Sequence, residues 1–143
     1  YKVGGNYAAS LKANSIAHEK GYACEFYLDA KEKKYMDECG AANFFGIKDN
    51  TYITPKSTSI LPSITNRSLM QLAEDYGMKV ERRQIPEEEL TTFEEAGACG
   101  TAAVLSHILT TLILAYDTPS VKTENQVLFQ QNYTIICVPY NMV

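Results

Sequence analysis

Lys2-Val3-Gly4-Gly5-Asn6-Tyr7 opens the chain and places an amine next to two glycines and a phenol. Lysine condenses with aldehydes to form an exchangeable imine, and burial favours the neutral amine that this reaction needs. Gly4 and Gly5 allow a bound molecule to approach the backbone closely. Taken alone, Lys2 would also fit a frayed terminal lysine. The interpretation therefore depends on the motifs that follow.

Two later segments have the composition of phosphate-binding loops. Ser63-Ile64-Thr65 stands where an amphipathic helix over residues 64–76 is expected to begin. Backbone N–H groups and the positive end of the helix dipole hold phosphate at such a position. Gly100-Thr101-Ala102 offers a second set of the same donors. Each segment by itself could be a plain capping motif.

The acidic pair Asp37-Glu38 precedes Gly40, Ala41 and Ala42, a run of small residues that leaves room for a flat ring. A carboxylate against a pyridine nitrogen keeps that nitrogen protonated and makes the ring an electron sink. An ordinary solvated turn is the local alternative for the two acids. Together, the lysine, the acid and the two loops describe the ends of one cofactor, pyridoxal 5'-phosphate.

Residues 1 to about 106 resemble the C-terminal, cofactor-binding domain of a branched-chain amino acid aminotransferase, a fold-type IV pyridoxal phosphate enzyme. The resemblance implies an α+β fold, the large domain of that fold type, with mixed or antiparallel β-structure flanked by helices. It implies that Lys2 is catalytic, forms the Schiff base and moves the proton. The cofactor-binding residues would be Lys2, Tyr7, Glu38, Asn43, Leu61, Ile64, Thr65 and Thr101.

The resemblance also assigns individual roles. Tyr7 would contact the ring oxygen, Glu38 the pyridine nitrogen and Leu61 the ring face, while Ile64, Thr65 and Thr101 would bind phosphate. The backbone at Thr101 and Ala102 would face the substrate carboxylate. Ser63 stands where the family more often has glycine.

The implied reaction transfers an amino group between leucine, isoleucine or valine and 2-oxoglutarate. Related fold-type IV enzymes, D-amino acid aminotransferase and aminodeoxychorismate lyase, remain alternatives, as does a non-catalytic remnant that binds the cofactor without turnover. Because the family's N-terminal domain is missing and the chain starts at Tyr1, we expect a fragment with weak or no activity alone. The family also implies a homodimer for the full-length enzyme.

Composition limits the other possibilities. The net charge of -4 and the absence of a basic run argue against nucleic acid and anionic membranes as partners. Two histidines and four scattered cysteines indicate neither a metal site nor a disulfide scaffold. No apolar run is long enough for a transmembrane helix. We therefore expect a cytoplasmic protein.

Local patterns predict the order of the elements. We expect helices over residues 6–20, 64–76 and 86–92, and strands over 23–28, 42–54, 79–84 and 96–105. A turn at 48–50 would break the second strand region, and Gly100 would interrupt the last one. From His107 onward the chain has only three charged residues and follows no pattern of the family. We expect a partial cofactor domain over 1–106 and a divergent tail over 107–143. A strand pair that completes a core is the simplest reading of that tail.

Overall fold

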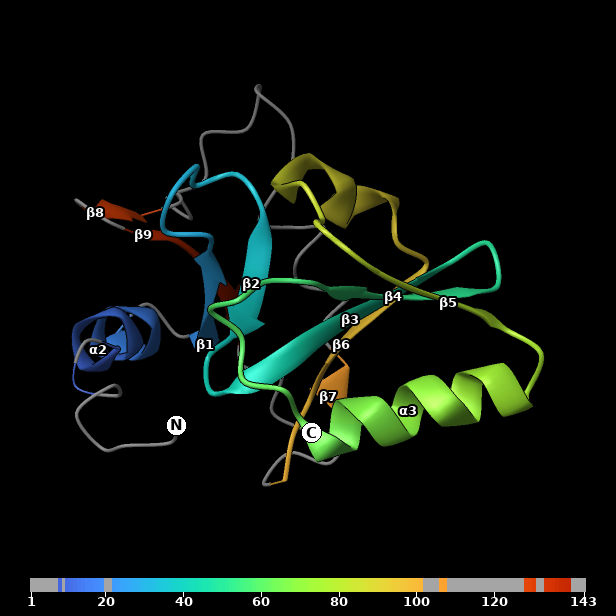
Figure 1. Ribbon diagram of the computed structural model, residues 1–143. Coiled ribbons are helices and arrows are strands. Elements are labelled where there is room, and N and C mark those ends of the chain that lie inside the picture. The colour runs from blue at the N-terminus through green and yellow to red at the C-terminus, as the bar shows by residue number, and fades with distance from the viewer. Residues whose placement is uncertain are drawn as a thin grey trace.

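The computed structural model describes residues 8, 10–19, 22–101, 106–107, 128–130 and 133–139, which form a mixed sheet flanked by helices (Figure 1). This architecture confirms the expected α+β class. The described elements are α2 (Leu11–Glu19), β1 (Tyr22–Leu28), β2 (Met36–Cys39), β3 (Ala42–Lys48), β4 (Thr51–Pro55), α3 (Ile64–Asp75), β5 (Lys79–Arg83), the 3-10 helix η1 (Glu87–Thr92), β6 (Glu95–Cys99), β7 (Ser106–His107), β8 (Leu128–Gln130) and β9 (Tyr133–Pro139).

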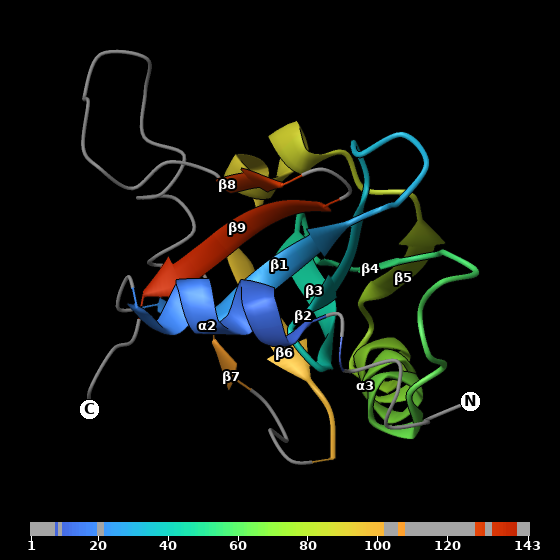
Figure 2. The same cartoon turned by 90° about the vertical axis from the view of Figure 1, so that its left-hand side faces the viewer.

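The strands follow the order β5-β4-β3-β2-β1-β9-β8, with β6 paired to β3 and β7 paired to β6. β4 and β5 run parallel, because α3 connects them, and the other described pairs are antiparallel. Figure 2 shows β9 lying along β1, with α2 across both strands. Part of the expected tail thus joins this sheet in the structure.

Strand β3 pairs with three other strands. One edge pairs with β6 from Asn43 to Ile47. The opposite edge pairs first with β2, at Ala42 and Asn43, and then with β4, from Gly46 to Lys48. β2 and β4 therefore separate along the same edge of β3, and the connection between β4 and α3 passes at the point where they separate.

A tight turn joins β3 to β4. Asp49 and Asn50 have φ values of 48° and 55°, the left-handed conformation that both central residues of a two-residue type I′ hairpin need. Asp and Asn tolerate this conformation better than most residues. The expected break at 48–50 is therefore confirmed as a hairpin turn.

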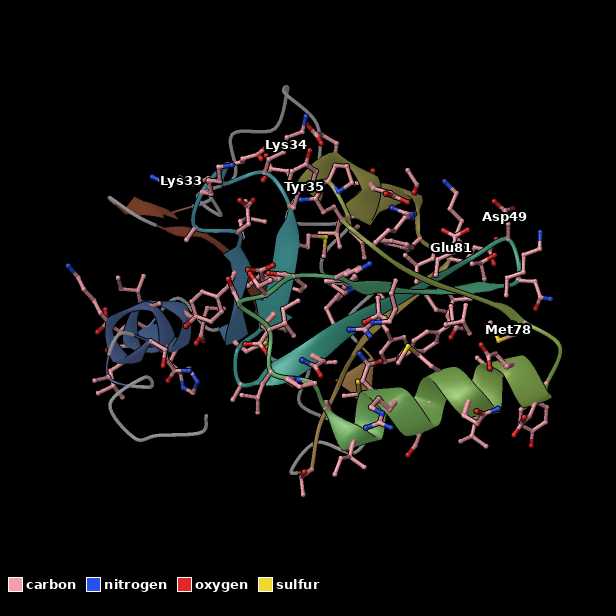
Figure 3. All side chains as sticks on the ribbon, viewed as in Figure 1. Lys33, Lys34, Tyr35, Asp49, Met78 and Glu81 are labelled. Atoms are coloured by element: carbon pink, nitrogen blue, oxygen red, sulfur yellow. The ribbon has the colours of Figure 1, made fainter. Side chains whose placement is uncertain are left out.

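The two faces of the sheet carry different apolar clusters. Successive residues of a strand point to opposite faces, so Phe44 packs with Phe26 and Phe93 while Phe45 stacks on Tyr52 at 5.1 Å beneath α3. Met78, between α3 and β5, packs on the second cluster (Figure 3). Asn43 and Phe45 share the α3 face by the same alternation.

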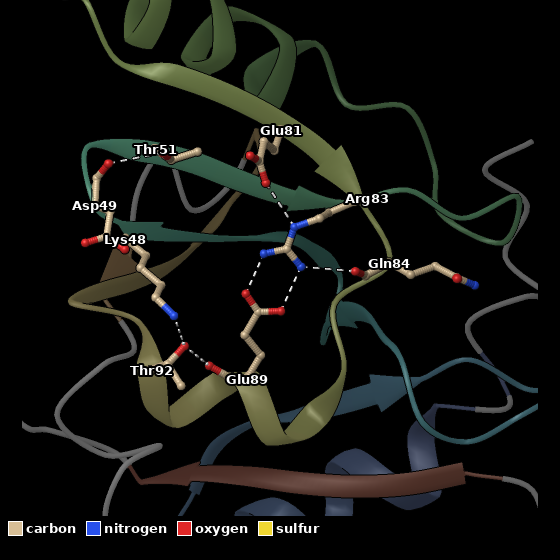
Figure 4. Close-up of polar contacts among 8 residues, drawn as sticks. All are labelled: Lys48, Asp49, Thr51, Glu81, Arg83, Gln84, Glu89 and Thr92. Atoms are coloured by element: carbon tan, nitrogen blue, oxygen red, sulfur yellow. Dashed lines mark hydrogen bonds and ion pairs between the residues drawn. The ribbon is translucent and has the colours of Figure 1, made fainter.

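Polar contacts fix η1 against β5 (Figure 4). Arg83 makes a two-pronged ion pair with Glu89, in which Nη1 donates to Oε2 at 2.7 Å, and its Nε also contacts Glu81 at 3.0 Å. The guanidinium lowers the pKa of Glu89. This pairing holds η1 over the apolar cluster formed by Phe44 and its neighbours.

Most predicted elements occur near their expected positions, but strands β2 and β7 were not predicted. The helix at 64–76 is confirmed as α3, which ends before Gly77 with its φ of 79°. The helix expected over 86–92 is a 3-10 helix. The strand expected from residue 96 is β6, which ends before Gly100. The solvated-turn alternative for Asp37 and Glu38 is wrong, because both residues lie in β2.

The structure does not describe residues 1–7, 9, 20 and 21. The beginning of the expected first helix therefore stays a prediction. Among the described residues, no helix is long and apolar enough to cross a membrane.

Candidate functional site

Three residues on neighbouring strands form a row on the α3 face of the sheet. Glu38 of β2 is paired with Asn43 of β3, and Asn43 is paired with Cys99 of β6 on the other edge. Side chains of directly paired residues lie on the same face. The sheet therefore brings together a carboxylate, an amide and a thiol that are far apart in sequence.

A cavity of about 220 Å³ lies against this row. Its remaining walls come from the loop that leads into α3 and from the segment after β6. The lining residues are Glu38, Ala41, Asn43, Leu61, Pro62, Ser63, Ile64, Cys99, Gly100 and Thr101. The volume falls below the roughly 300–1,000 Å³ of typical ligand pockets. We therefore treat this cavity as part of a candidate ligand site.

The amide of Asn43 holds the carboxylate of Glu38 in place. Asn43 Nδ2 donates to Glu38 Oε1 at 3.1 Å and to the carbonyl oxygen of Leu61 at 3.4 Å, and Leu61 N donates to Glu38 Oε1 at 3.4 Å. Because a carboxylate and a carbonyl only accept hydrogen bonds, the NH₂ group of Asn43 must face them. The orientation of this amide is thereby fixed.

The opposite atom of the same amide has no hydrogen-bond partner among the described residues. Asn43 is 5% exposed, and among the described residues its Oδ1 is buried without a hydrogen-bond donor. An unpaired buried acceptor is costly and calls for an explanation. Since Asn43 lines the cavity, a ligand or an ordered water that donates to Oδ1 would provide one.

The start of α3 gives the cavity an anion-binding end. Ser63 is the N-cap, and its Oγ accepts from Asn66 N at 3.2 Å. The N–H groups of Ile64 and Thr65 in the first turn have no intrahelical acceptor, and the helix dipole places partial positive charge there. The cavity therefore combines a carboxylate with a site that favours negative groups.

The cavity brings together five of the residues predicted from the sequence. They are Glu38, Asn43, Leu61, Ile64 and Thr101. Thr65 lies half-buried in the first turn of α3 but is not among the lining residues. Lys2, Tyr7 and Ala102 lie outside the described residues, so their predicted roles stay predictions.

Sequence reasoning missed Cys99 as a lining residue. It immediately precedes the predicted loop Gly100-Thr101, which is the only local signal. Its position opposite Asn43 follows from the register of β3 and β6, which no local pattern encodes.

The class of protein follows from a comparison with known families. Residues 1–109 match the class IV aminotransferase family, and the chain belongs to that family. It is 57% identical over 109 residues to the branched-chain-amino-acid aminotransferase of Helicobacter pylori, covering 75% of this chain and 32% of that protein. The Haemophilus influenzae enzyme of the same name is 52% identical over 114 residues, which cover 33% of its length.

Solved structures agree with this assignment. The branched-chain amino acid aminotransferase of Thermobaculum terrenum in its PLP form superposes with a TM-score of 0.69 at 35% identity, over 74% of this chain and 34% of that one. The Escherichia coli enzyme gives a TM-score of 0.66 at 33% identity, over 74% and 36%. The chain spans about a third of the length of the curated relatives that it matches.

Proposed function

We propose that residues 1–106 are part of the cofactor domain of a cytoplasmic, homodimeric aminotransferase. The enzyme would use pyridoxal 5'-phosphate to move an amino group between a branched-chain L-amino acid and 2-oxoglutarate by a Schiff-base route. Residues 107–143 would form a divergent tail that takes no part in the chemistry. The names and the PLP form of the relatives support this proposal.

The residues present fit the cofactor. A phosphate suits the start of α3 and the segment at Thr101, and Glu38 suits a protonated ring nitrogen. The observation that carries the proposal is that these two kinds of partner share one cavity with a buried acceptor, Asn43 Oδ1, that lacks a donor.

When bound, pyridoxal phosphate supplies the carbonyl that exchanges amino groups and a ring that withdraws electrons. Lys2 would hold it covalently and carry a proton at Nζ, and Tyr7 would orient the ring oxygen. Leu61 would pack on the ring face and limit the access of water. Asn43 would keep the carboxylate of Glu38 aimed at the ring nitrogen, because its Nδ2 already donates to Oε1.

Borohydride reduction in the presence of pyridoxal phosphate tests the attachment. Peptide mapping should place the pyridoxyl mass on Lys2, and Lys2→Arg should abolish the label at this position. A label on Lys12 or Lys56 instead would refute the assignment of Lys2.

Activity assays test the reaction. The 143-residue chain should bind the cofactor but turn over L-leucine and 2-oxoglutarate poorly, since positioning of the substrate is worth several orders of magnitude in rate. Joining it to the family's N-terminal domain should raise the rate at least about a hundredfold on the same argument. Preference for D-alanine or aminodeoxychorismate would favour the related enzymes, and binding without any turnover in the joined protein would favour the remnant.

A further inference from the structure

A buried chain of hydrogen bonds connects α3 to strands β4 and β3 of the sheet. Tyr52 Oη donates to Asn66 Oδ1 at 2.7 Å, Asn66 Nδ2 donates to Thr54 Oγ1 at 2.9 Å, and Thr54 Oγ1 donates to the carbonyl oxygen of Phe44 at 2.8 Å. Tyr52, Thr54 and Asn66 are all buried. Buried polar groups in a fully paired network hold one arrangement strongly.

The donors and acceptors in this chain are fixed in direction. The carbonyl of Phe44 can only accept, so the proton of the Thr54 hydroxyl points to it. Thr54 Oγ1 then accepts from the NH₂ group of Asn66, which turns Asn66 Oδ1 toward Tyr52. The phenol proton of Tyr52 is therefore committed to Asn66.

Two members of this network, Asn66 and Tyr52, contact residues that line the cavity. Asn66 N donates to Ser63 Oγ, and Ser63 lines the cavity at the start of α3. Tyr52 also belongs to the same buried cluster as Cys99, which lines the cavity just before Gly100 and Thr101. Burial raises the pKa of the Cys99 thiol, so the thiol remains protonated at neutral pH. Hydrogen bonds from the start of α3 and the packing of Tyr52 with Cys99 thus connect the two predicted phosphate-binding segments.

From this geometry we infer that Tyr52, Asn66 and Thr54 are positioning residues that set the spacing between the start of α3 and the segment at Thr101. Their role is to shape the end of the cavity that receives the phosphate of the cofactor. The inference rests on the proposed function and deepens it. Asn43 Oδ1, which is buried in the same cavity without a donor among the described residues, independently indicates a missing ligand.

Packing does not explain the hydroxyl of Tyr52. Its ring stacks on Phe45 with centroids 5.1 Å apart and an interplanar angle of 11°. A phenylalanine ring would make the same stack. The phenol oxygen therefore contributes through its hydrogen bonds, and Tyr52→Phe removes it while preserving the aromatic packing.

The test compares two ligands that differ only in the phosphate. Dissociation constants of pyridoxal phosphate and pyridoxal are measured spectroscopically on the wild-type 143-residue protein and on Tyr52→Phe. We expect Tyr52→Phe to weaken pyridoxal phosphate about five- to tenfold and pyridoxal less than about twofold, the size expected if the phosphate loses about one hydrogen bond when the spacing of the two segments relaxes. The control is Thr51→Val, which removes a buried hydroxyl of β4 that bonds to the carbonyl of Asp49 and should change neither constant.

A second pair of variants keeps the test decisive if Tyr52→Phe does not fold. Thr54→Val removes the hydroxyl that links Asn66 to Phe44, whereas Thr54→Ser retains it. Only the valine variant should lose selectivity for the phosphorylated ligand. Equal weakening of both ligands, or no change in either, would overturn the positioning role. A wild-type protein that binds neither ligand would instead refute the proposed function.

Discussion

Replacing Asn43 by aspartate keeps the shape of the side chain but turns a donor into an acceptor. In the wild-type protein, Asn43 Nδ2 donates to Glu38 Oε1 at 3.1 Å and to the carbonyl of Leu61 at 3.4 Å. After Asn43→Asp, a second carboxylate oxygen would face Glu38 at this distance. Two carboxylates so close cannot both be ionised without a large cost, so they would share one proton.

The magnitude follows from these contacts. A hydrogen bond to a charged group contributes about 1.5–3 kcal/mol. Like charges at this separation would repel by roughly 5 kcal/mol at an effective dielectric constant of about 20, which is an upper limit because a retained proton relieves the repulsion. We therefore expect Asn43→Asp to reduce the free energy of unfolding by about 3 kcal/mol at pH 8.

The sign of the pH dependence is distinctive. The folded variant holds the shared proton more tightly than the unfolded chain does, so its stability is greatest at low pH and is lost as the pH rises. The deficit relative to the wild-type protein should shrink below about 1 kcal/mol at pH 4.5, where the proton restores a hydrogen bond between the two carboxyl groups.

Urea unfolding at pH 8, 6.5 and 4.5 measures the deficit, with Asn43→Ala as the matched variant. The alanine variant loses the same hydrogen bonds without adding a charge, so its deficit should change little with pH. A deficit of Asn43→Asp that is the same at pH 8 and pH 4.5 would refute the reasoning. Unchanged stability at pH 8 would show that the contact with Glu38 does not exist.

Three further substitutions test other parts of the structure. Glu38→Gln should leave cofactor binding largely intact, since an amide oxygen can still accept from Asn43. It should lower turnover in the complete enzyme, because a neutral amide cannot hold the proton on the ring nitrogen. Unchanged turnover would contradict this role of Glu38. Gly46→Ala should cost about 1–3 kcal/mol in urea unfolding through overpacking, because the new Cβ would lie 2.6 Å from the Phe93 ring. Burial raises the pKa of Asp37 despite its bond to Ser57, so the folded state binds this proton more tightly, and stability is lost as the pH rises through the raised pKa. Asp37→Asn should therefore raise the melting temperature at pH 7 but not at pH 3, and an equal gain at both values would exclude this cause.

Much of the fold could be predicted from local signals. The helix starting at Ile64 has an N-cap serine, a periodic apolar face and a closing glycine, and its bounds were found to within one or two residues. Strand β2 was missed because it has only four residues, two of them acidic. Its stability comes from pairing on both edges, with β1 and β3, and from the burial of Met36 and Cys39.

Some residues of the candidate site could likewise be predicted from local motifs, and others could not. Glu38, Leu61 and Thr101 could be named because they stand in motifs that resemble a known family. The position of Cys99 opposite Asn43, and the bond from Tyr52 to Asn66, depend on strand register and on how α3 packs. These are tertiary contacts, and no local periodicity in a single sequence indicates them.

The three-way pairing of β3 also has a consequence for the order of folding. The hairpin of β3 and β4 closes through the two-residue turn at Asp49 and Asn50, and such hairpins form in about 1–10 μs. Pairing of β6 with β3 must instead wait for a long loop to close, which is slower and entropically more costly. Destabilising substitutions in the hairpin should slow folding, whereas those in β6 should mainly speed unfolding, and chevron kinetics would distinguish the two. We therefore expect the row from Glu38 to Cys99, and with it the ligand cavity, to form after the hairpin of β3 and β4.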